Sequence, residues 1–341
     1  NGDDTFTGGT EVDTFNVDAG TDTITDLNGI EIAADILNVS ALATANATIT
    51  AAFTATIATT NAGAVTLNSA GFDVDMSQAG GVNGYTINNT AAPALTILTG
   101  SAFNDAINGG TGADTIKGMA GNDELLGGNG ADSIEGGAGV DLITGGAGAD
   151  GINLLEGVAI DADHVIYASA TDGNASGAIT IAGADSVINF VVANDTIDIG
   201  GALRTSLTAP TPGTELVDNL LGNVADLGAD ARVDLGVNDI FTLQVTNLNA
   251  SADFADVTKL LGAGGAFDLD PTVGGSDTFR TTAVVAGDKA IFLVSDDTSN
   301  LSGLYLFTAA NTNNTVDTGE LTLLSIITAN AQLTSANITV I

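Results

Sequence analysis

A pattern of nine residues repeats six times from Gly100 without an insertion or deletion. Written as rows, the segment reads GSAFNDAIN, GGTGADTIK, GMAGNDELL, GGNGADSIE, GGAGVDLIT and GGAGADGIN. The sixth position of every row is Asp, and the eighth is Ile or Leu. Because this period is neither that of a helix nor that of a continuous strand, each row is predicted to be a short strand joined to a glycine-rich turn. A flexible linker would not keep Asp and an aliphatic residue in register.

Apolar burial alone cannot stabilise rows that contain one large aliphatic residue each. One buried Ile or Leu per row contributes about 1.5–3 kcal/mol, whereas ordering nine backbone residues costs roughly 1–2 kcal/mol for each residue. Stacking would place strands about 4.8 Å apart, so aspartates two rows apart would repel by roughly 3.5 kcal/mol per pair at an effective dielectric constant of about 20. A cation is therefore predicted to supply the missing stabilisation. Carboxylate and carbonyl oxygens are the ligands that Ca²⁺ prefers, and a chain with no Cys and one His lacks the ligands that zinc prefers.

The rows resemble the GGxGxDxUx nonapeptides of RTX proteins, which bind Ca²⁺ in parallel β-helical repeats. This resemblance implies a β-roll in which the first six residues of a row form a calcium-binding turn, the last three form a strand, and two rows complete one circuit. The first row departs from the pattern at Ser101 and Phe103, which stand where glycines are expected, and the third row departs at Met119.

The resemblance also assigns the metal ligands row by row. The carboxylates are those of Asp105, Asp114, Asp123, Asp132, Asp141 and Asp150. The carbonyl donors are those of the turn glycines Gly110, Gly112, Gly121, Gly128, Gly130, Gly137, Gly139, Gly146 and Gly148. Residues 1–16 carry one partial and one degenerate repeat, which place Asp4 and Asp13 at equivalent points and make them further candidate ligands. Weaker candidates, for which an exposed strand edge is an equally good interpretation, are Asp22, Asp26, Asp35, Asp195 and Asp198.

The chain is predicted to be all-β, with a calcium-binding parallel β-roll, flanking β-solenoid or sandwich regions and a mainly β C-terminal domain with a few short helices. A strand is expected over residues 47–60 with Ile49 and Ile57 on its buried face. Helices are expected at 214–222 and 251–262, and an antiparallel meander over 283–328. The predicted segments are 1–40 (the end of one roll with capping strands), 41–99 (a Thr/Ala-rich β region), 100–153 (the roll), 154–200 (capping strands) and 201–341 (the C-terminal domain).

The charge of the chain excludes several classes of partner. Acidic residues number 42 and basic residues 6, which gives a formal net charge of −36. Nucleic acid and anionic membrane surfaces are therefore not expected as partners. A composition that is 44% hydrophobic argues against disorder. No apolar run is long enough to span a membrane, and with His164 as the single histidine and no G-x-S-x-G motif, no enzymatic activity is expected.

A Thr/Ala-rich, Lys-poor and Cys-free chain with such rows resembles RTX-type bacterial S-layer and related surface-assembly proteins. The resemblance implies a calcium-dependent structural protein at the cell surface, exported through type I secretion, which assembles with copies of itself into an S-layer, filament or matrix. A cell-envelope polysaccharide is a further candidate partner.

Two alternatives stay open: the C-terminal module of a large RTX adhesin, and the calcium-folded delivery region of a secreted RTX enzyme. Because the first residues lie inside a repeat, we expect the chain to be part of a longer polypeptide. The last residues, 336–341, fit a secretion signal and an ordinary closing strand equally well.

Overall fold

The computed structural model divides the chain into two compact units, Asn1–Gly145 with Ile152–His164, and Gly146–Gly151 with Val165–Ile341. The residues that the structure describes are 2–28, 34–89, 95–157, 161–173, 180–200, 203, 217–220, 240–245, 250–256, 286, 289–296, 299–310 and 318–341.

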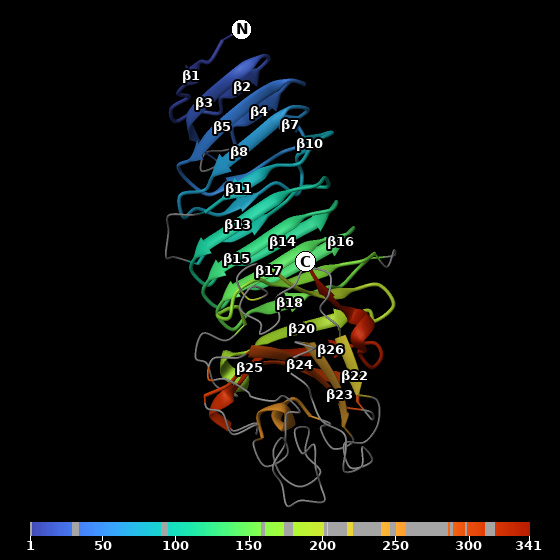
Figure 1. The fold of residues 1–341 in the computed structure, drawn as a ribbon. Coiled ribbons are helices and arrows are strands. Elements are labelled where there is room, and N and C mark those ends of the chain that lie inside the picture. The colour runs from blue at the N-terminus through green and yellow to red at the C-terminus, as the bar shows by residue number, and fades with distance from the viewer. Residues whose placement is uncertain are drawn as a thin grey trace, which may run out of the picture. The chain divides into compact units, whose positions relative to one another are not determined.

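The first unit is a stack of parallel strands in which the chain advances by one circuit at a time (Figure 1). We call each circuit a coil. Sheet 1 contains β1 (Thr5–Phe6), β3 (Gly20–Leu27), β5 (Ala43–Ile49), β8 (Ala64–Asn68), β11 (Thr86–Asn88), β13 (Ala106–Thr111), β15 (Glu124–Asn129) and β17 (Leu142–Ala147). Sheet 2 contains β2 (Thr14–Val17), β4 (Ile36–Val39), β7 (Thr60–Asn61) and β10 (Gly80–Gly81). Sheet 3 contains β6 (Phe53–Thr54), β9 (Val74–Asp75), β12 (Ile97–Thr99), β14 (Thr115–Ala120), β16 (Ser133–Ala138) and β18 (Gly151–Asn153).

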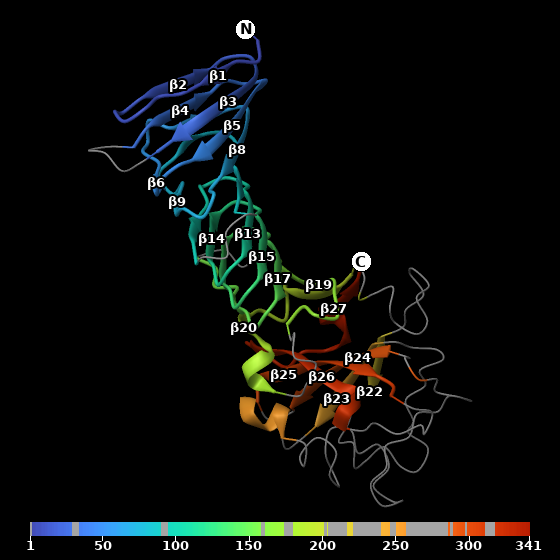
Figure 2. The same cartoon turned by 90° about the vertical axis from the view of Figure 1, so that its left-hand side faces the viewer.

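Two nine-residue rows complete one coil, as the RTX resemblance implied. Ala106 of β13 pairs with Glu124 of β15, and the corresponding Asp105 and Asp123 are 18 residues apart. Consecutive rows therefore alternate between sheet 1 and sheet 3, and Figure 2 shows β13 and β15 of sheet 1 as neighbours. The roll is confirmed as a parallel β-roll.

The division of a row into turn and strand differs from the expected one. Each of β13 to β17 is six residues long rather than three. It runs from the seventh position of one row to the third position of the next. The extension arises because the paired glycines also join the parallel ladder, as in the pairing of Gly110 with Gly128. Only the fourth to sixth positions are left to form the turn.

Three residues of each repeat face the interior of the roll, and two of them carry side chains. Residues alternate between the two faces of a strand, so the sixth, eighth and following first positions all point inward. The buried aliphatic residues are Ile107, Ile116, Leu125, Ile134, Ile143 and Ile152. The buried acids are Asp105, Asp114, Asp123, Asp132, Asp141 and Asp150. The core is therefore an aliphatic stripe bordered by carboxylates.

The predicted strand over 47–60 is wrong in its second half. The chain forms β5 and β6 with a bend between them, and then turns into β7 of sheet 2. Ile57 lies at this corner and is 84% exposed, whereas Thr59 takes the inward position. Sheet 2, which the roll lacks, makes these coils longer, and Thr66 and Thr86 pair across a coil of 20 residues.

The strands expected to cap the roll are interior members of their sheets. β3 pairs with β1 on one side and β5 on the other, and β4 pairs with β2 and β7. In the second unit, β20 (Asp185–Phe190) pairs with β26 (Leu321–Ala329), and Ser186 also donates its N–H to the carbonyl of Asp150. The inward residues of these strands repeat the Asp-x-apolar pattern of the rows.

The second unit contains the antiparallel meander that was predicted. β25 (Leu301–Thr308) is antiparallel to both β24 (Lys289–Asp296) and β26. Phe292 and Phe307 meet edge to face at 6.3 Å in its core. Residues 283–285, which were expected to open the meander, lie outside the described residues. The remaining strands of this unit are β19 (His164–Tyr167), β21 (Thr196–Ile199), β22 (Val217–Leu220), β23 (Ile240–Val245) and β27 (Ile338–Val340).

The two predicted helices are not found as such. Residues 217–220 form strand β22, so the helix expected at 214–222 is wrong there. The other begins as the short 3₁₀ helix η3 (Ser251–Ala255), with 257–262 outside the described residues. Further 3₁₀ turns are η1 (Ile181–Gly183), η4 (Thr318–Glu320) and η5 (Ser335–Asn337). Within the described ranges, no helix combines the length and the apolar character that crossing a membrane requires.

Candidate calcium sites

A ladder of hydrogen bonds holds one oxygen of each inward aspartate in the roll. The backbone N–H of Asp105 donates to Oδ1 of Asp123 at 2.7 Å, one coil further along. The same bond is made by Asp123 to Asp141 at 2.9 Å, and by Asp114 to Asp132 at 2.7 Å. Because Oδ1 is fixed by the backbone of the preceding coil, the direction of Oδ2 is fixed as well.

The second oxygen of three carboxylates in the roll is buried without a hydrogen-bond donor. In the part of the chain that the structure describes, Oδ2 of Asp114, Asp123 and Asp141 has no hydrogen-bond partner, and neither has Oδ2 of Asp13. A buried charged oxygen without a partner is strongly unfavourable, and native proteins satisfy nearly all such atoms. These oxygens therefore require a cation or a proton.

Glycine at the first position of each row leaves space beside this oxygen. A Cβ atom on Gly109 would lie 3.0 Å from Oδ2 of Asp114 and 2.6 Å from the carbonyl oxygen of Gly127, one coil away. A Cβ atom on Gly118 would collide in the same way with Oδ2 of Asp123 and the carbonyl oxygen of Gly136. A carboxylate oxygen and a carbonyl oxygen thus converge on a space that only glycine keeps open. Oxygen donors of these two kinds fit Ca²⁺.

The candidate sites do not consist of clusters of three or more carboxylates. No group of three or more Asp, Glu or His side chains is placed to hold a metal among the residues described. This is expected of a roll because each row supplies one carboxylate, and the other donors must be backbone carbonyls.

Burial also perturbs the protonation of the carboxylates. Burial, helped by neighbouring aspartates and opposed by the N–H donor, raises the pKa of Asp123 and of Asp141 to about 7. Burial likewise raises the pKa of Asp132 to about 6. In the absence of a cation, these groups are partly protonated near neutral pH. Binding Ca²⁺ must then release protons, because a carboxylate binds metal in its ionised form.

Comparison with known families agrees with this geometry. A family model described as the RTX calcium-binding nonapeptide repeat (4 copies) matches residues 1–25, 99–134 and 126–157. The chain carries RTX calcium-binding repeats. No curated protein matches the chain. The matched segments include the rows that contain Asp114, Asp123 and Asp141, and also the N-terminal segment that contains Asp4 and Asp13.

The RTX glycines at the second and fourth positions shape the turns. Gly128 and Gly130 have φ angles of 111° and 137°, which L side chains rarely adopt. A Cβ atom on either would collide with the carbonyl of Gly110 or Gly112, one coil below. The other predicted glycines with positive φ are Gly110, Gly121, Gly137, Gly139 and Gly146. Ligation by their carbonyls, and by those of Gly112 and Gly148, stays a prediction.

The first RTX row satisfies its aspartate without a cation. Oδ2 of Asp105 accepts the N–H of Ser101 at 2.6 Å and lies 3.0 Å from its hydroxyl, while Oδ1 accepts the N–H of Tyr85 at 2.5 Å. Ser101 is one of the residues that replace glycine in this row. Although burial raises the pKa of Asp105 as well, its carboxylate has donors on both oxygens and differs from that of Asp123.

The two N-terminal candidates and Asp150 follow the same ladder. Asp4 donates its N–H to Oδ1 of Asp22, and Asp13 donates to Oδ1 of Asp35, both at 2.9 Å. A Cβ atom on Gly8 would collide with Oδ2 of Asp13, as in the roll, whereas Asp4 is exposed. In the second unit, the N–H of Asp150 donates to Oδ1 of Asp185 at 2.8 Å.

Two members of the ladder were missed from the sequence. Asp163 accepts the N–H of Asp141 at 3.0 Å, and Asp185 accepts that of Asp150. Neither follows a glycine-rich stretch, so the nonapeptide pattern passes over them. A simpler signal identifies both, since each is followed two residues later by a buried Val, at 165 and 187.

Proposed function

We propose that the chain is a calcium-dependent structural protein of the bacterial cell surface. The observation that carries the proposal is the set of buried Oδ2 atoms in the RTX rows, which leaves the roll dependent on a cation. Calcium sites of the extracellular type bind at about 10⁻⁴–10⁻³ M. Such sites stay empty in the cytosol and fill outside the cell, so that export through type I secretion precedes folding.

The proposed role is assembly into an S-layer, filament or matrix rather than catalysis. The stack offers extended sheet faces, and its formal charge of −36 makes Ca²⁺ useful a second time, between the acidic surfaces of neighbouring copies. The proposed partners are Ca²⁺, further copies of the chain and a cell-envelope polysaccharide. No catalytic role is assigned to the chain.

A calcium titration of the purified chain tests this proposal. Circular dichroism should show a gain of strand content between about 0.1 and 1 mM Ca²⁺, and electron microscopy should show ordered sheets or filaments above that range. Folding into a monomer that binds cells would support the adhesin module instead. A catalytic motif upstream of residue 1 in the full gene would support a delivery region. Strand content that is insensitive to EGTA would contradict calcium-dependent folding itself.

A further inference from the structure

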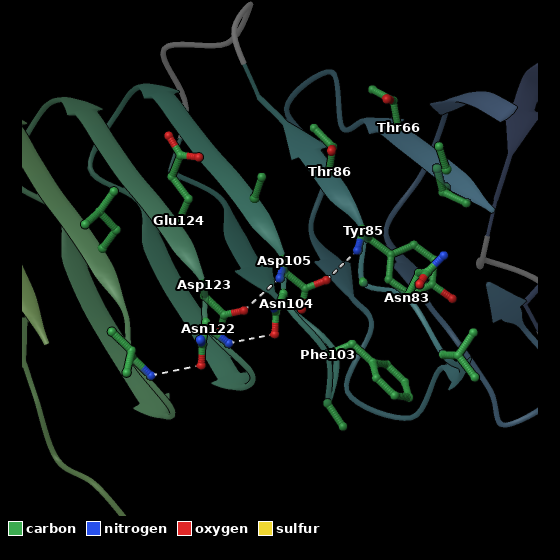
Figure 3. A pocket seen from close by; sticks show the side chains of 18 residues that line it. Thr66, Asn83, Tyr85, Thr86, Phe103, Asn104, Asp105, Asn122, Asp123 and Glu124 are labelled. Carbon is green, nitrogen blue, oxygen red and sulfur yellow. Dashed lines mark hydrogen bonds between the residues drawn. The ribbon is translucent and has the colours of Figure 1, made fainter. Parts of the chain in front are cut away.

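An open groove of about 790 Å³ lies on the first unit, where the turns of the chain enter sheet 1 (Figure 3). It crosses successive coils, from Thr66 through Thr86 and Ala106 to Glu124 and Leu142. With coils about 4.8 Å apart, the four intervals give a length of roughly 19 Å. The groove therefore suits a chain-like ligand that lies along the stack.

A row of oriented amides lines the groove. Oδ1 of Asn104 accepts the backbone N–H of Asn122 at 2.8 Å, and Oδ1 of Asn122 accepts the N–H of Val140 at 3.1 Å. Figure 3 shows Asn104 and Asn122 on successive coils, joined by the first of these bonds. Because each carbonyl oxygen is held by the backbone, the amide nitrogens of Asn104 and Asn122 are left as fixed donors on two successive coils.

The remaining lining provides an aromatic ring and acceptors but no positive charge. Phe103 is partly exposed, and Thr66 and Thr86 supply hydroxyl groups. Glu124 is an exposed carboxylate on the same wall. Among the residues that the structure describes, no Lys, Arg or His lines the groove. An anionic ligand would be repelled, whereas a molecule with many hydroxyl groups and apolar ring faces would find a partner for each kind of group.

We propose that this groove binds a neutral glycan, with its chain running along the stack of coils. The amide nitrogens of Asn104 and Asn122 would donate to sugar hydroxyls, and the ring of Phe103 would stack on the apolar face of a sugar. The spacing of the coils is comparable to the rise of one pyranose unit in an extended chain. The two amides thus present one donor to each of two successive sugars.

The opposite edge of the roll shows that this lining is not a consequence of the RTX fold. There the corresponding fourth and fifth positions are Gly112–Ala113 and Gly130–Ala131. These turns carry neither an amide nor an aromatic ring. The groove is therefore built by the residues that depart from glycine and alanine at positions 103, 104 and 122.

Isothermal titration of the full chain in saturating Ca²⁺ tests the proposal. The probes are neutral oligosaccharides of two to six glucose, mannose or N-acetylglucosamine units, together with a hexauronate. Affinity for one neutral series should rise with length up to about four units, set by the coil spacing, and then level off. Failure of every neutral hexasaccharide to bind at millimolar concentration, or equal binding of the hexauronate, would overturn the proposal.

A matched pair of phenylalanines locates the binding. Phe103→Ala should lower the affinity for the best oligosaccharide at least tenfold. Phe72→Ala removes another partly exposed ring, 39% exposed on a turn outside the groove, and should leave the affinity unchanged. If Phe103→Ala fails to fold, Phe103→Leu keeps the apolar volume without the ring face and should show the same loss. Equal losses in the Phe72 and Phe103 variants would rule out this groove.

Discussion

The coils between Ala43 and Thr99, here called the upstream coils, are built of parallel strands like the RTX roll. The two regions satisfy their buried polar groups in different ways. Upstream, the hydroxyl of Ser69 donates to Oδ1 of Asn89 at 2.9 Å, and the amide of Asn89 donates to Oγ1 of Thr96 at 2.9 Å. In the roll, the corresponding groups are carboxylates, of which Asp123 and Asp141 keep a buried oxygen without a donor. The coils around Asn89 are closed by neutral hydrogen bonds, whereas the roll requires a cation or a proton.

The length of a coil explains why one region uses neutral hydrogen bonds and the other uses carboxylates. A coil of 20 residues upstream has room for a third short strand and several inward apolar residues, such as Phe53 and Val65. A coil of 18 residues in the roll buries two aliphatic side chains, and much of the remainder forms glycine-rich turns. Apolar burial can offset the entropy lost on ordering the longer coil. In the shorter coil burial is insufficient, and metal binding must supply the remaining stabilisation.

The largest expected effect is the loss of the roll when calcium is removed. In EGTA, amide hydrogen exchange should lose protection across β13 to β16 and keep it across β5 and β8. The reason is that each buried carboxylate left without a partner costs roughly 3–5 kcal/mol. Hydrogen-exchange mass spectrometry with and without 5 mM Ca²⁺ would measure this. Uniform loss in both regions would show that the upstream coils depend on the ion as well.

Filling the space beside one aspartate should have the next largest effect. Gly118→Ala places a methyl group against Oδ2 of Asp123 and the carbonyl of Gly136, and overpacking of this kind costs about 1–3 kcal/mol. Gly157→Ala is the control, because nothing lies within 4 Å of its Cβ position. Calcium affinity and urea unfolding should change in the first variant and not in the second.

Removing a single charge should separate the first RTX row from the third. Asp123→Asn should weaken calcium binding by about tenfold or more, since affinity depends on the number of charged ligands. Asp105→Asn should leave it nearly unchanged, because Ser101 and Tyr85 already donate to that carboxylate. Calorimetric titration of both variants tests the difference. An equal loss would mean that the first row also holds an ion.

The local fold could be predicted from the sequence because each RTX row carries the same pattern independently. Six in-register copies specify the inward Asp and Ile or Leu, the parallel stacking and the preferred ion. The hydrogen-bonding state of an individual aspartate could not be predicted. Whether Ser101 donates to Asp105 depends on the backbone path of one turn, and the replacement of glycine at that position indicates only that the row is unusual.

The upstream coils were harder to predict because their pattern changes at corners. Alternation placed Ile49 correctly on the inner face, but it continued through a bend to Ile57, which lies outside. Polar residues such as Thr59 and Asn61 take inward positions there, and an apolar-only pattern misreads them. Sheet 2 forms because the chain bends at these corners, and strand periodicity alone could not predict it.

Acid should partly replace calcium in the roll. Burial raises the pKa of Asp123 and Asp141 from 3.8 to about 7, so folding favours their protonated forms. The stability gained by protonation is full below pH 3.8 and is lost as the pH rises through 7. In EGTA, the melting temperature of the roll should therefore be higher at pH 5 than at pH 8. With Ca²⁺ present, the order should reverse, because protons compete with the ion. The same pH dependence with and without Ca²⁺ would contradict this assignment.

The smallest expected effect is a gain in stability at Met119, the departure in the third row. Met119 has a φ angle of 83°, and a left-handed backbone costs a residue other than glycine about 1–2 kcal/mol. Met119→Gly relieves this strain, against an entropic cost of about 0.5–1 kcal/mol, and loses little packing because the side chain is 43% exposed. Urea unfolding in saturating Ca²⁺ should show a gain of about 0.5–1 kcal/mol. Ala120→Gly, at a neighbouring residue without positive φ, should instead destabilise the roll, and a gain in both variants would refute the strain argument.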